Sequence, residues 1–279
     1  MASLVSLVAA LVGGAAVAET SGQRSAGLCT EPEPWVERCA REPTLRGIDV
    51  SDWQGEIDWV AVRASGIRFA FVRVSDGATA PDPAFARNWA AAARAGVSRG
   101  AYQFFRPAED PEEQADLFLE MVGSLHKGDL PPALDVEVSG DLEPAEIVAR
   151  IERWVRRVGR VATVRPIVYT SALHWLELAG NSRRFRHHCL WVAHHGADCP
   201  NVPCHWQRWS FHQSSASGHV AGIAGVVDED RFQGNASALR RLTVRDGAAA
   251  SVAWRRWKRH RDRASSVSLP LVGPPTPSP

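Results

Sequence analysis

The sequence predicts an α/β fold, a modified TIM-like (β/α) barrel formed by a single domain. Short apolar runs alternate with helical stretches between Arg46 and Leu242, and this alternation is typical of a parallel sheet covered by helices. Runs such as Phe69–Val74 are almost continuously apolar, as expected for strands that are buried on both faces. About eight such runs favour a closed barrel over an open doubly wound sheet.

The expected strands are short, and apolar residues dominate each of them. In chain order they are Gly47–Val50, Phe69–Val74, Gly100–Phe104, Ala133–Val136, Pro166–Tyr169, Leu190–Ala193, Trp209–Gln213 and Gly225–Val227. Helices are expected over Asp82–Ala95, Asp110–Val122 and Glu143–Val158. The second of these helices begins with Asp-Pro-Glu-Glu, which makes a good cap and first turn. No Gly-rich phosphate loop follows the first strand, which argues against a nucleotide-binding fold.

The two ends of the chain differ in composition from the middle. Residues 1–18 are expected to be a signal peptide, because the apolar run Leu4–Val17 is followed by an Ala-x-Ala-like cleavage site. The basic start usual for a signal peptide is missing, so a retained anchor or a misassigned start codon remains an alternative. Residues 19–45 form an N-terminal extension, residues 46–242 the barrel, and residues 243–279 a basic and then Pro- and Ser-rich tail.

Charge is concentrated in this tail, although the whole chain has a formal net charge of only +1. The segment from Trp254 to Arg263 contains six basic residues and one Asp, which gives a local net charge of +5. We expect Arg255, Arg256, Lys258 and Arg259 to attract anionic envelope polymers; the alternative is a solvated helix that covers the end of the barrel. Neither a nucleic-acid footprint in the main body nor a stable membrane span is expected.

The chain has five cysteines, and in an exported protein two local disulfides are the simplest interpretation. We expect Cys29 to pair with Cys39 and Cys199 with Cys204, which leaves Cys189 as a buried thiol. A zinc site is the alternative, because two cysteines and three histidines lie close together in the chain: His194, His195, Cys199, Cys204 and His205. Their spacing does not match a common zinc signature, so neither a metal nor another cofactor is expected.

An active site of this fold lies at the carboxyl ends of the strands. Acidic, aromatic and polar residues recur at those positions: Asp49, Asp76, Tyr102, Asp135, Glu137, Tyr169, His194, Gln213 and Asp228. Asp135 and Glu137 are two residues apart, so at a strand end their carboxyls lie on the same side. Each carboxylate then disfavours ionisation of the other, and one can remain protonated and act as a general acid. A solvated loop pair is the alternative.

Seven ordered motifs resemble glycoside hydrolase family 25 lysozymes, over about residues 46–242. They include Gly47-Ile48-Asp49-Val50-Ser51-Asp52-Trp53-Gln54, Phe71-Val72-Arg73-Val74-Ser75-Asp76-Gly77, Gly100-Ala101-Tyr102-Gln103-Phe104-Phe105, Leu134-Asp135-Val136-Glu137, Val168-Tyr169-Thr170-Ser171, Leu190-Trp191-Val192-Ala193 and Trp209-Ser210-Phe211-His212-Gln213. The resemblance implies a single catalytic barrel, secreted or held in the periplasm or cell envelope. It also implies hydrolysis of the β-1,4 bond between N-acetylmuramic acid and N-acetylglucosamine in peptidoglycan.

The resemblance also implies roles for individual residues. Glu137 would be the acid/base, and Asp135 would orient or stabilise the charged intermediate. Asp49 and Asp228 would complete an acidic cluster, and either an Asp or the acetamido group of the substrate would be the nucleophile. The expected substrate-binding residues are Tyr102, Tyr169, Trp191, Gln213 and Asp76.

Four positions depart from the family pattern. Gln103 stands where His is usual, His195 and Ser214 stand where Tyr is usual, and His212 replaces an aromatic residue. Because all four acidic positions are retained, we expect an altered substrate groove in a working enzyme. Two other functions remain alternatives: a non-catalytic wall-binding module of the same fold, and a hydrolase of another polysaccharide.

Overall fold

The computed structural model describes residues 34–41 and 43–267. The expected signal peptide and Cys29 lie outside this part of the chain. The described strands are β1 (Trp35–Glu37), β2 (Thr44–Val50), β3 (Phe69–Asp76), β4 (Ala80–Pro81), β5 (Ser98–Phe104), β6 (Ala133–Asp135), β7 (Ile167–Ser171), β8 (Leu190–Ala193), β9 (Asn201–Pro203), β10 (Phe211–Gly218) and β11 (Val227–Gln233). The α-helices are α1 (Trp59–Ala64), α2 (Phe85–Arg94), α3 (Pro111–Val122), α4 (Pro144–Ala162), α5 (Ala172–Ala179), α6 (Ala236–Leu242) and α7 (Gly247–Val267). Two short 3-10 helices, η1 (Asp52–Gln54) and η2 (Arg183–Phe185), complete the set.

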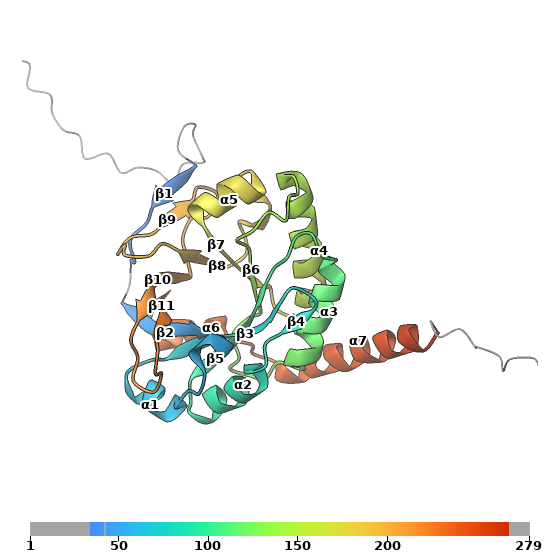
Figure 1. Ribbon diagram of the computed structural model, residues 1–279, viewed down its shortest axis with the longest axis horizontal. Helices are drawn as coiled ribbons and strands as arrows, with labels where there is room; N and C mark the ends of the chain where they lie inside the picture. Colours follow the sequence, from blue (N-terminus) through green and yellow to red (C-terminus); the bar gives the residue numbers. More distant parts are fainter. Residues whose placement is uncertain (1–33, 42, 268–279) are drawn as a thin grey trace, which may run out of the picture.

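Eight of these strands close into a barrel, so the predicted fold class is confirmed. Their order around the barrel is β2, β11, β10, β8, β7, β6, β5 and β3, and β3 pairs back to β2. Figure 1 looks nearly along this barrel and shows α1 to α5 around its outside. The short strand β4 pairs only with the end of β3, outside the ring.

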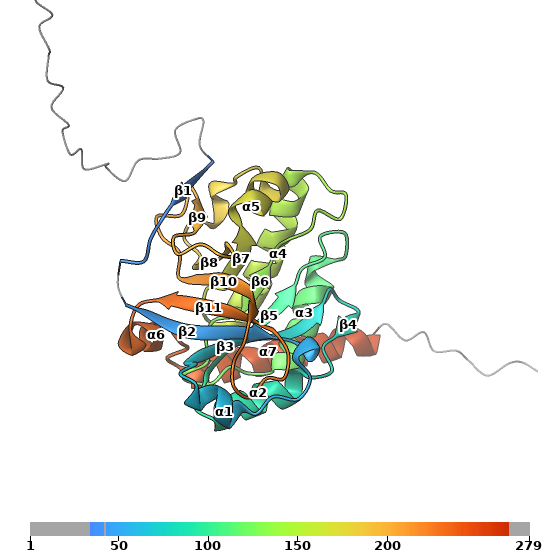
Figure 2. The same ribbon diagram turned by 60° about the vertical axis from the view of Figure 1, so that its left-hand side comes forward.

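The closing strand differs from the expectation of an all-parallel sheet. β11 runs antiparallel to both of its neighbours, β10 and β2, and the three strands lie side by side in Figure 2. The strand expected over Gly225–Val227 is therefore wrong in position, because β11 begins at Val227. Only residues 219–226 separate β10 from β11, too few for the crossover helix that a parallel pair would need.

Local sequence signals explain where the longer helices begin. Asp110 caps α3 by accepting hydrogen bonds from the backbone N–H groups of Glu112 and Glu113, and Pro111 and Pro144 occupy the first turns of α3 and α4. The inward face of α4 is fully apolar, as its periodicity predicts. Its buried residues are Ile147, Ile151, Trp154, Val155, Val158, Val161 and Ala162.

Aromatic rings fill the interior of the barrel. Phe71 stacks on Trp191 with ring centroids 4.3 Å apart, and Tyr169 meets the same indole edge-on at 4.5 Å. Glycine makes room for these rings, because a Cβ atom at Gly100 would lie 2.5 Å from the ring of Phe71. The closed floor of the barrel is thus a dry aromatic layer directly below the carboxyl ends of the strands.

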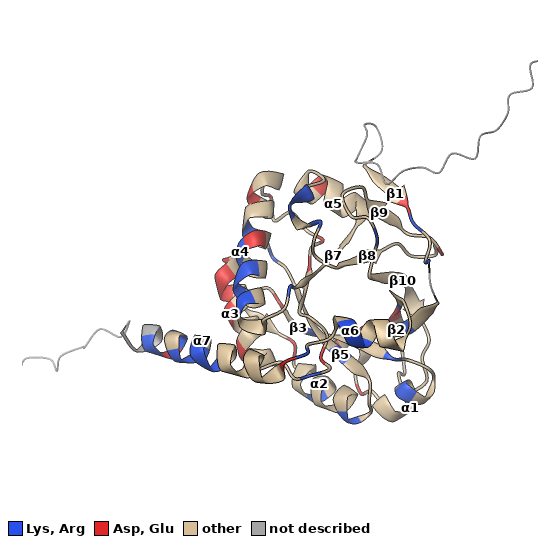
Figure 3. Ribbon diagram, turned by 180° about the vertical axis from the view of Figure 1, so that it is seen from behind, with Lys and Arg blue, Asp and Glu red and all other residues tan. Residues whose placement is uncertain are grey.

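The basic stretch near the C-terminus is part of α7, which packs against the barrel's outer helices. Trp254 donates its indole N–H to the carbonyl of Leu119, and Trp257 donates to Asp116, both on α3. Lys258 pairs with Glu120 at 3.2 Å. Basic residues cover much of the rest of α7 (Figure 3). Within the described residues, no helix has the length and apolarity needed to cross a membrane.

The cysteine pairing differs from the local loops that we expected. Cys39 is bonded to Cys199, 160 residues away, and Cys204 is also disulfide-bonded. Cys189 is free, as expected, but it is half-buried and not buried. Strand β9 separates Cys199 from Cys204, and an extended segment of that length holds their Cα atoms more than about 10 Å apart, beyond the reach of a disulfide. Pairing of β1 with β9 instead brings Cys39 beside Cys199.

These disulfides also argue against the zinc alternative. Among the described residues, the one group that could hold a metal ion is Glu37, Cys39 and Cys199. Both of its sulfur atoms belong to the disulfide, so they cannot act as thiolate ligands.

Loss of the Cys39–Cys199 bond should destabilise the protein, because the bond closes a loop of 160 residues. For the double variant Cys39→Ser/Cys199→Ser we expect a fall in the free energy of unfolding on the order of 3–5 kcal/mol, measured by denaturant titration. Cys189→Ser is the matched control, since it removes a sulfur atom without removing a bridge. Non-reducing peptide mapping should recover Cys39 linked to Cys199, and a Cys199–Cys204 peptide would contradict the pairing.

Candidate active site

Two acidic residues meet where β2 and β11 pair. Asp49 lies near the carboxyl end of β2, and Asp228 lies directly opposite it in the register of β11. Asp228 stands near the start of its strand rather than at the end that we expected. Because β11 is antiparallel, its start lies at the same rim of the barrel as the ends of the parallel strands. The chain reversal therefore brings Asp228 to the site.

Gln213, at the end of the parallel part of β10, connects three other side chains at this rim. Its amide Nε2 donates to Asp49 Oδ2 at 2.8 Å. Its Oε1 accepts a hydrogen bond from the hydroxyl of Tyr169 and also lies within hydrogen-bond distance of Nε2 of His195, each at 2.8 Å. An amide oxygen can only accept, so His195 carries a proton on Nε2 in this arrangement. The amide thereby fixes the orientation of Asp49 and Tyr169.

Burial favours the neutral form of Asp49. It is the largest cause that raises the pKa of Asp49 well above its usual range, and the charge of Asp228 adds to it. Burial also raises the pKa of Asp228, but nearby His195 and a hydrogen bond shared with Asp49 act in the opposite direction. The proton of this pair is therefore held by Asp49, and Asp228 is the member that ionises more easily.

Asp135 and Glu137 form a second acidic pair at the end of β6. Asp135 is 6% exposed and its Oδ1 has no hydrogen-bond partner, whereas Glu137 is half-buried. Burial, then the charge of Glu137 and then that of Asp49, raise the pKa of Asp135 well above its usual range. The pair thus has one buried member that favours its proton and one member within reach of solvent.

Two tyrosines lie among these carboxyls. Burial is the main cause that raises the pKa of both phenols, and Asp49 and Asp135 add to it at each of them. Glu137 adds further to the shift at Tyr169. Tyr169 lies beside Asp135 in the sheet register and is hydrogen-bonded to Gln213, which binds Asp49, so it links the two acidic pairs into one cluster. Both phenols remain hydrogen-bond donors at physiological pH.

A fifth carboxyl, Asp230, was missed by the sequence reasoning. It is 1% exposed, and its Oδ1 accepts from the indole N–H of Trp191 at 2.7 Å. Burial and the charge of Asp49 raise its pKa well above the usual range. Side chains two residues apart on a strand point to the same face, so the position of Asp228 could have revealed Asp230. The expected strand, however, stopped at Val227.

Other expected site residues lie at the edge or below the floor of this cluster. Asp76 makes a two-pronged ion pair with Arg106, with N–O distances of 2.5 and 2.6 Å. Trp191 is 1% exposed and supports Tyr169 and Asp230 from inside the barrel. By contrast, Trp53 on η1 is 83% exposed, after the carboxyl end of β2.

Only one of the four departures from the family pattern reaches the acidic cluster. Gln103 is fully buried behind the barrel wall, where its amide accepts from Trp154 Nε1 at 2.6 Å and donates to Ser75. His212 is likewise buried, and its Nε2 lies 2.9 Å from the carbonyl of His194. Ser214 donates to the backbone of Glu229. Side chains alternate across a strand, so these three point away from the acidic cluster; their effect on the substrate groove stays a prediction.

Comparison with known proteins decides the family of this barrel. The model of glycosyl hydrolases family 25 matches residues 48–223. The chain belongs to glycosyl hydrolases family 25. It is therefore a glycoside hydrolase of the lysozyme type, as the motifs predicted.

Relatives and solved structures agree with this assignment. Lysozyme M1 of Streptomyces globisporus is 35% identical over 226 residues, which cover 77% of each chain. YegX, an uncharacterized protein of Escherichia coli K12, is 39% identical over 71% of this chain and 72% of its own. The crystal structure of a lysozyme from Streptomyces coelicolor superposes with a TM-score of 0.69 at 34% identity, over 71% of this chain and 96% of that chain. A family 25 lysozyme from Aspergillus fumigatus gives a TM-score of 0.67 at 28% identity, over 72% and 99%.

The raised pKa of Asp135 predicts how stability depends on pH. A carboxyl whose folded pKa lies above its unfolded value binds more protons in the folded state, so its contribution is complete below about pH 4 and is lost as the pH rises through the folded pKa. Asp135→Asn should therefore flatten the decline in Tm between pH 4 and 8. Asp141→Asn is the control, because Asp141 is exposed and its left-handed backbone suits Asn equally well. Equal slopes for wild type and Asp135→Asn would contradict this account.

A positive charge on the imidazole of His195 should lower the pKa of Asp228 and so favour its ionised form. The His195→Gln variant retains an N–H donor for Gln213 but cannot carry charge, so the pKa of Asp228 should rise. Carboxyl-carbon NMR titration of Asp228 in the two proteins measures this directly. An unchanged titration midpoint would show that the histidine acts only as a hydrogen-bond donor.

Proposed function

We propose that this protein is a secreted muramidase. It cleaves the β-1,4 bond between N-acetylmuramic acid and N-acetylglucosamine in peptidoglycan, with Glu137 as acid/base. The observation that carries the proposal is the Asp135–Glu137 pair, one carboxyl buried and the other half-buried, at the mouth of a family 25 barrel. Two carboxyls at a glycosidic bond supply both an acid and a counter-charge for an oxocarbenium-like transition state.

In this mechanism the pair holds one proton and delivers it through Glu137. Asp135 is too deeply buried to meet the leaving oxygen itself, and its raised pKa marks it as the resting place of the proton. The proton first moves from Asp135 to Glu137, which neutralises Glu137 and leaves Asp135 ionised. Glu137 then gives the proton to the leaving oxygen, and the Asp135 carboxylate stabilises the positive charge that develops on the sugar. Tyr169 and Gln213 hold Asp49 in place on the opposite wall of the cluster.

The remaining assignments follow from the same proposal. Tyr102, Tyr169, Trp191, Gln213 and Asp76 form or support the sugar-binding walls. Asp49 and Asp228 provide the second pair of carboxyls. Among the relatives, proteins named lysozyme M1 and N,O-diacetylmuramidase support the choice of substrate.

We also propose that the protein acts outside the cytoplasm. The Cys39–Cys199 disulfide supports export, since such bonds persist in oxidising compartments, and residues 1–18 have the composition of a signal peptide. The basic residues Arg255, Arg256, Lys258 and Arg259 of the tail would then meet anionic polymers of the envelope. Residues 46–242 would be the catalytic unit.

A non-catalytic wall-binding module of the same fold is the main competing function. A module that only binds sugar has no need of buried carboxyls, because each lowers stability when ionised in a dry site. This chain retains Asp49, Asp135 and Asp230, all at most 6% exposed. The cost of burying them fits a catalytic role better than a binding role.

Glu137→Gln should abolish hydrolysis while the fold is retained, because an amide cannot deliver a proton to the leaving oxygen. Loss of a general acid lowers the rate by a factor on the order of 10²–10⁴. The assay is release of new reducing ends from purified peptidoglycan, with mass spectrometry to identify the terminal sugar. Glu177→Gln, at an exposed position on α5, is the control. A folded Glu137→Gln protein with wild-type turnover would refute the assignment, and N-acetylglucosamine at the new reducing end would refute the bond.

A further inference from the structure

Two grooves on the outer surface of the protein each have four arginines among their lining residues. The first lies between α4 and the segments that lead into β7 and β8, with a volume of about 590 Å³. The second lies between α4 and α7, with a volume of about 1130 Å³. Arg160 lines both grooves, so the two grooves are neighbours on the surface around α4.

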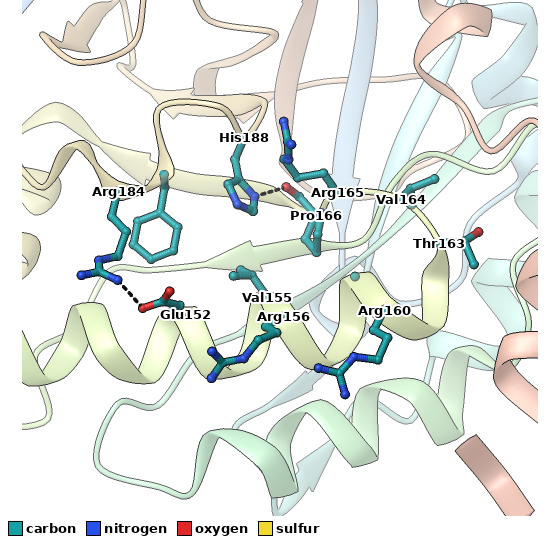
Figure 4. Close-up of a pocket in the computed structure, with 12 residues that line it drawn as sticks. Glu152, Val155, Arg156, Arg160, Thr163, Val164, Arg165, Pro166, Arg184 and His188 are labelled. Atoms are coloured by element: carbon teal, nitrogen blue, oxygen red, sulfur yellow. Dashed lines mark hydrogen bonds and ion pairs between the residues drawn. The ribbon is translucent and has the colours of Figure 1, made fainter. Parts of the chain in front are cut away.

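Five exposed arginines define this surface, which we call the arginine band. They are Arg156, Arg160, Arg165, Arg184 and Arg256. Figure 4 shows Arg156 and Arg160 extending from the same side of α4, with Arg165 and Arg184 on the facing segments. Of the carboxylates in the two grooves, Glu152 is paired with Arg184 at 2.8 Å and Asp116 is paired with Arg157 at 2.5 Å.

Most of the positive charge on the band is not neutralised by carboxylates of the described residues. Arg156, Arg160 and Arg256 have no carboxylate within ion-pair distance among the described residues. Arg156 and Arg160 are also one helical turn apart, a spacing at which like charges repel. Guanidinium groups left unpaired along a groove are ready to bind anions, and phosphate suits them because both of its oxygens can be held at once.

The length of the band indicates a polymer and not a single small anion. It runs over two neighbouring grooves, from the segment before β8, past α4, to α7. Single-stranded nucleic acids would need aromatic platforms for their bases. Here Phe185 is 1% exposed, and the ring of Trp257 is covered by Arg261, whose guanidinium lies 5.6 Å from its centroid. The grooves therefore fit a phosphate backbone that carries sugars or polyols.

The band also lies away from the acidic cluster. Residues 163–166 line the first groove immediately before β7 begins, whereas the catalytic rim is at the other ends of the strands. A chain bound to the band would leave the mouth of the barrel open.

We propose that the arginine band binds a flexible polyol-phosphate polymer and so holds the enzyme on surfaces that carry such polymers. That this polymer is one attached to cell walls rests on the proposed function; the binding itself does not. The band extends the predicted basic site beyond α7, and of the four basic residues expected there only Arg256 lines a groove.

Titration of the full-length protein with poly(glycerol phosphate) tests the proposal. The variant Arg156→Gln/Arg160→Gln/Arg256→Gln should bind about one to two orders of magnitude more weakly at low salt. The slope of log Kd against log salt concentration should fall by roughly 2, at about 0.7 for each lost contact with a flexible polyanion. The matched control is Arg41→Gln/Arg94→Gln/Arg240→Gln, which removes three exposed arginines that line neither groove and should bind like wild type.

Three results would overturn the proposal: unchanged binding by the band variant, equal weakening in both triple variants, or tighter binding of oligo(dT) with the same number of phosphates. Thermal unfolding checks that both variants are folded. Turnover on small soluble glycan fragments should be unchanged in the band variant, and Glu137→Gln should bind the polymer normally. If no protein hydrolyses glycan, the proposed function fails while the binding comparison still decides the role of the band.

Discussion

The exclusion of water from the carboxyl groups at the barrel mouth is the constraint on which this structure depends. Aromatic rings fill the barrel directly beneath Asp49, Asp135 and Asp230, and the dry floor raises the pKa of all three. In water these groups would be ordinary anions. Within this setting a proton becomes available at neutral pH, which is the condition for acid catalysis.

The polar groups around the cluster limit the cost of this arrangement. Gln213 gives Asp49 a hydrogen-bond donor, and Trp191 gives one to Asp230. Asp135 has less support, since one of its oxygens has no partner. That oxygen, without a hydrogen-bond partner, belongs to the Asp135–Glu137 pair, to which we assign the acid catalysis. Stability is therefore lower at the position where the mechanism needs a mobile proton.

The sequence was sufficient to predict the barrel and the Asp135–Glu137 pair, because both follow from local patterns. Apolar runs identify the strands, and the spacing of two residues puts both carboxyls on one side of β6. Asp230 and the disulfide partner of Cys39 could not be found in this way. Each depends on contacts between distant segments: β11 turns back between β10 and β2, and β1 pairs with β9. Gln103 and His212 illustrate the same limit, since only the register of the closed barrel tells which side of the wall they face.

The bond between Cys39 and Cys199 turns most of the catalytic barrel into a covalent ring. Proteolytic cleavage at any single peptide bond between these two residues would leave both fragments joined. Cut loops could thus remain docked, and the cluster of carboxyls would keep contributions from both sides of the cut. For the secreted enzyme that we propose, this tolerance to nicking would extend its working life among proteases without any increase in the stability of its core.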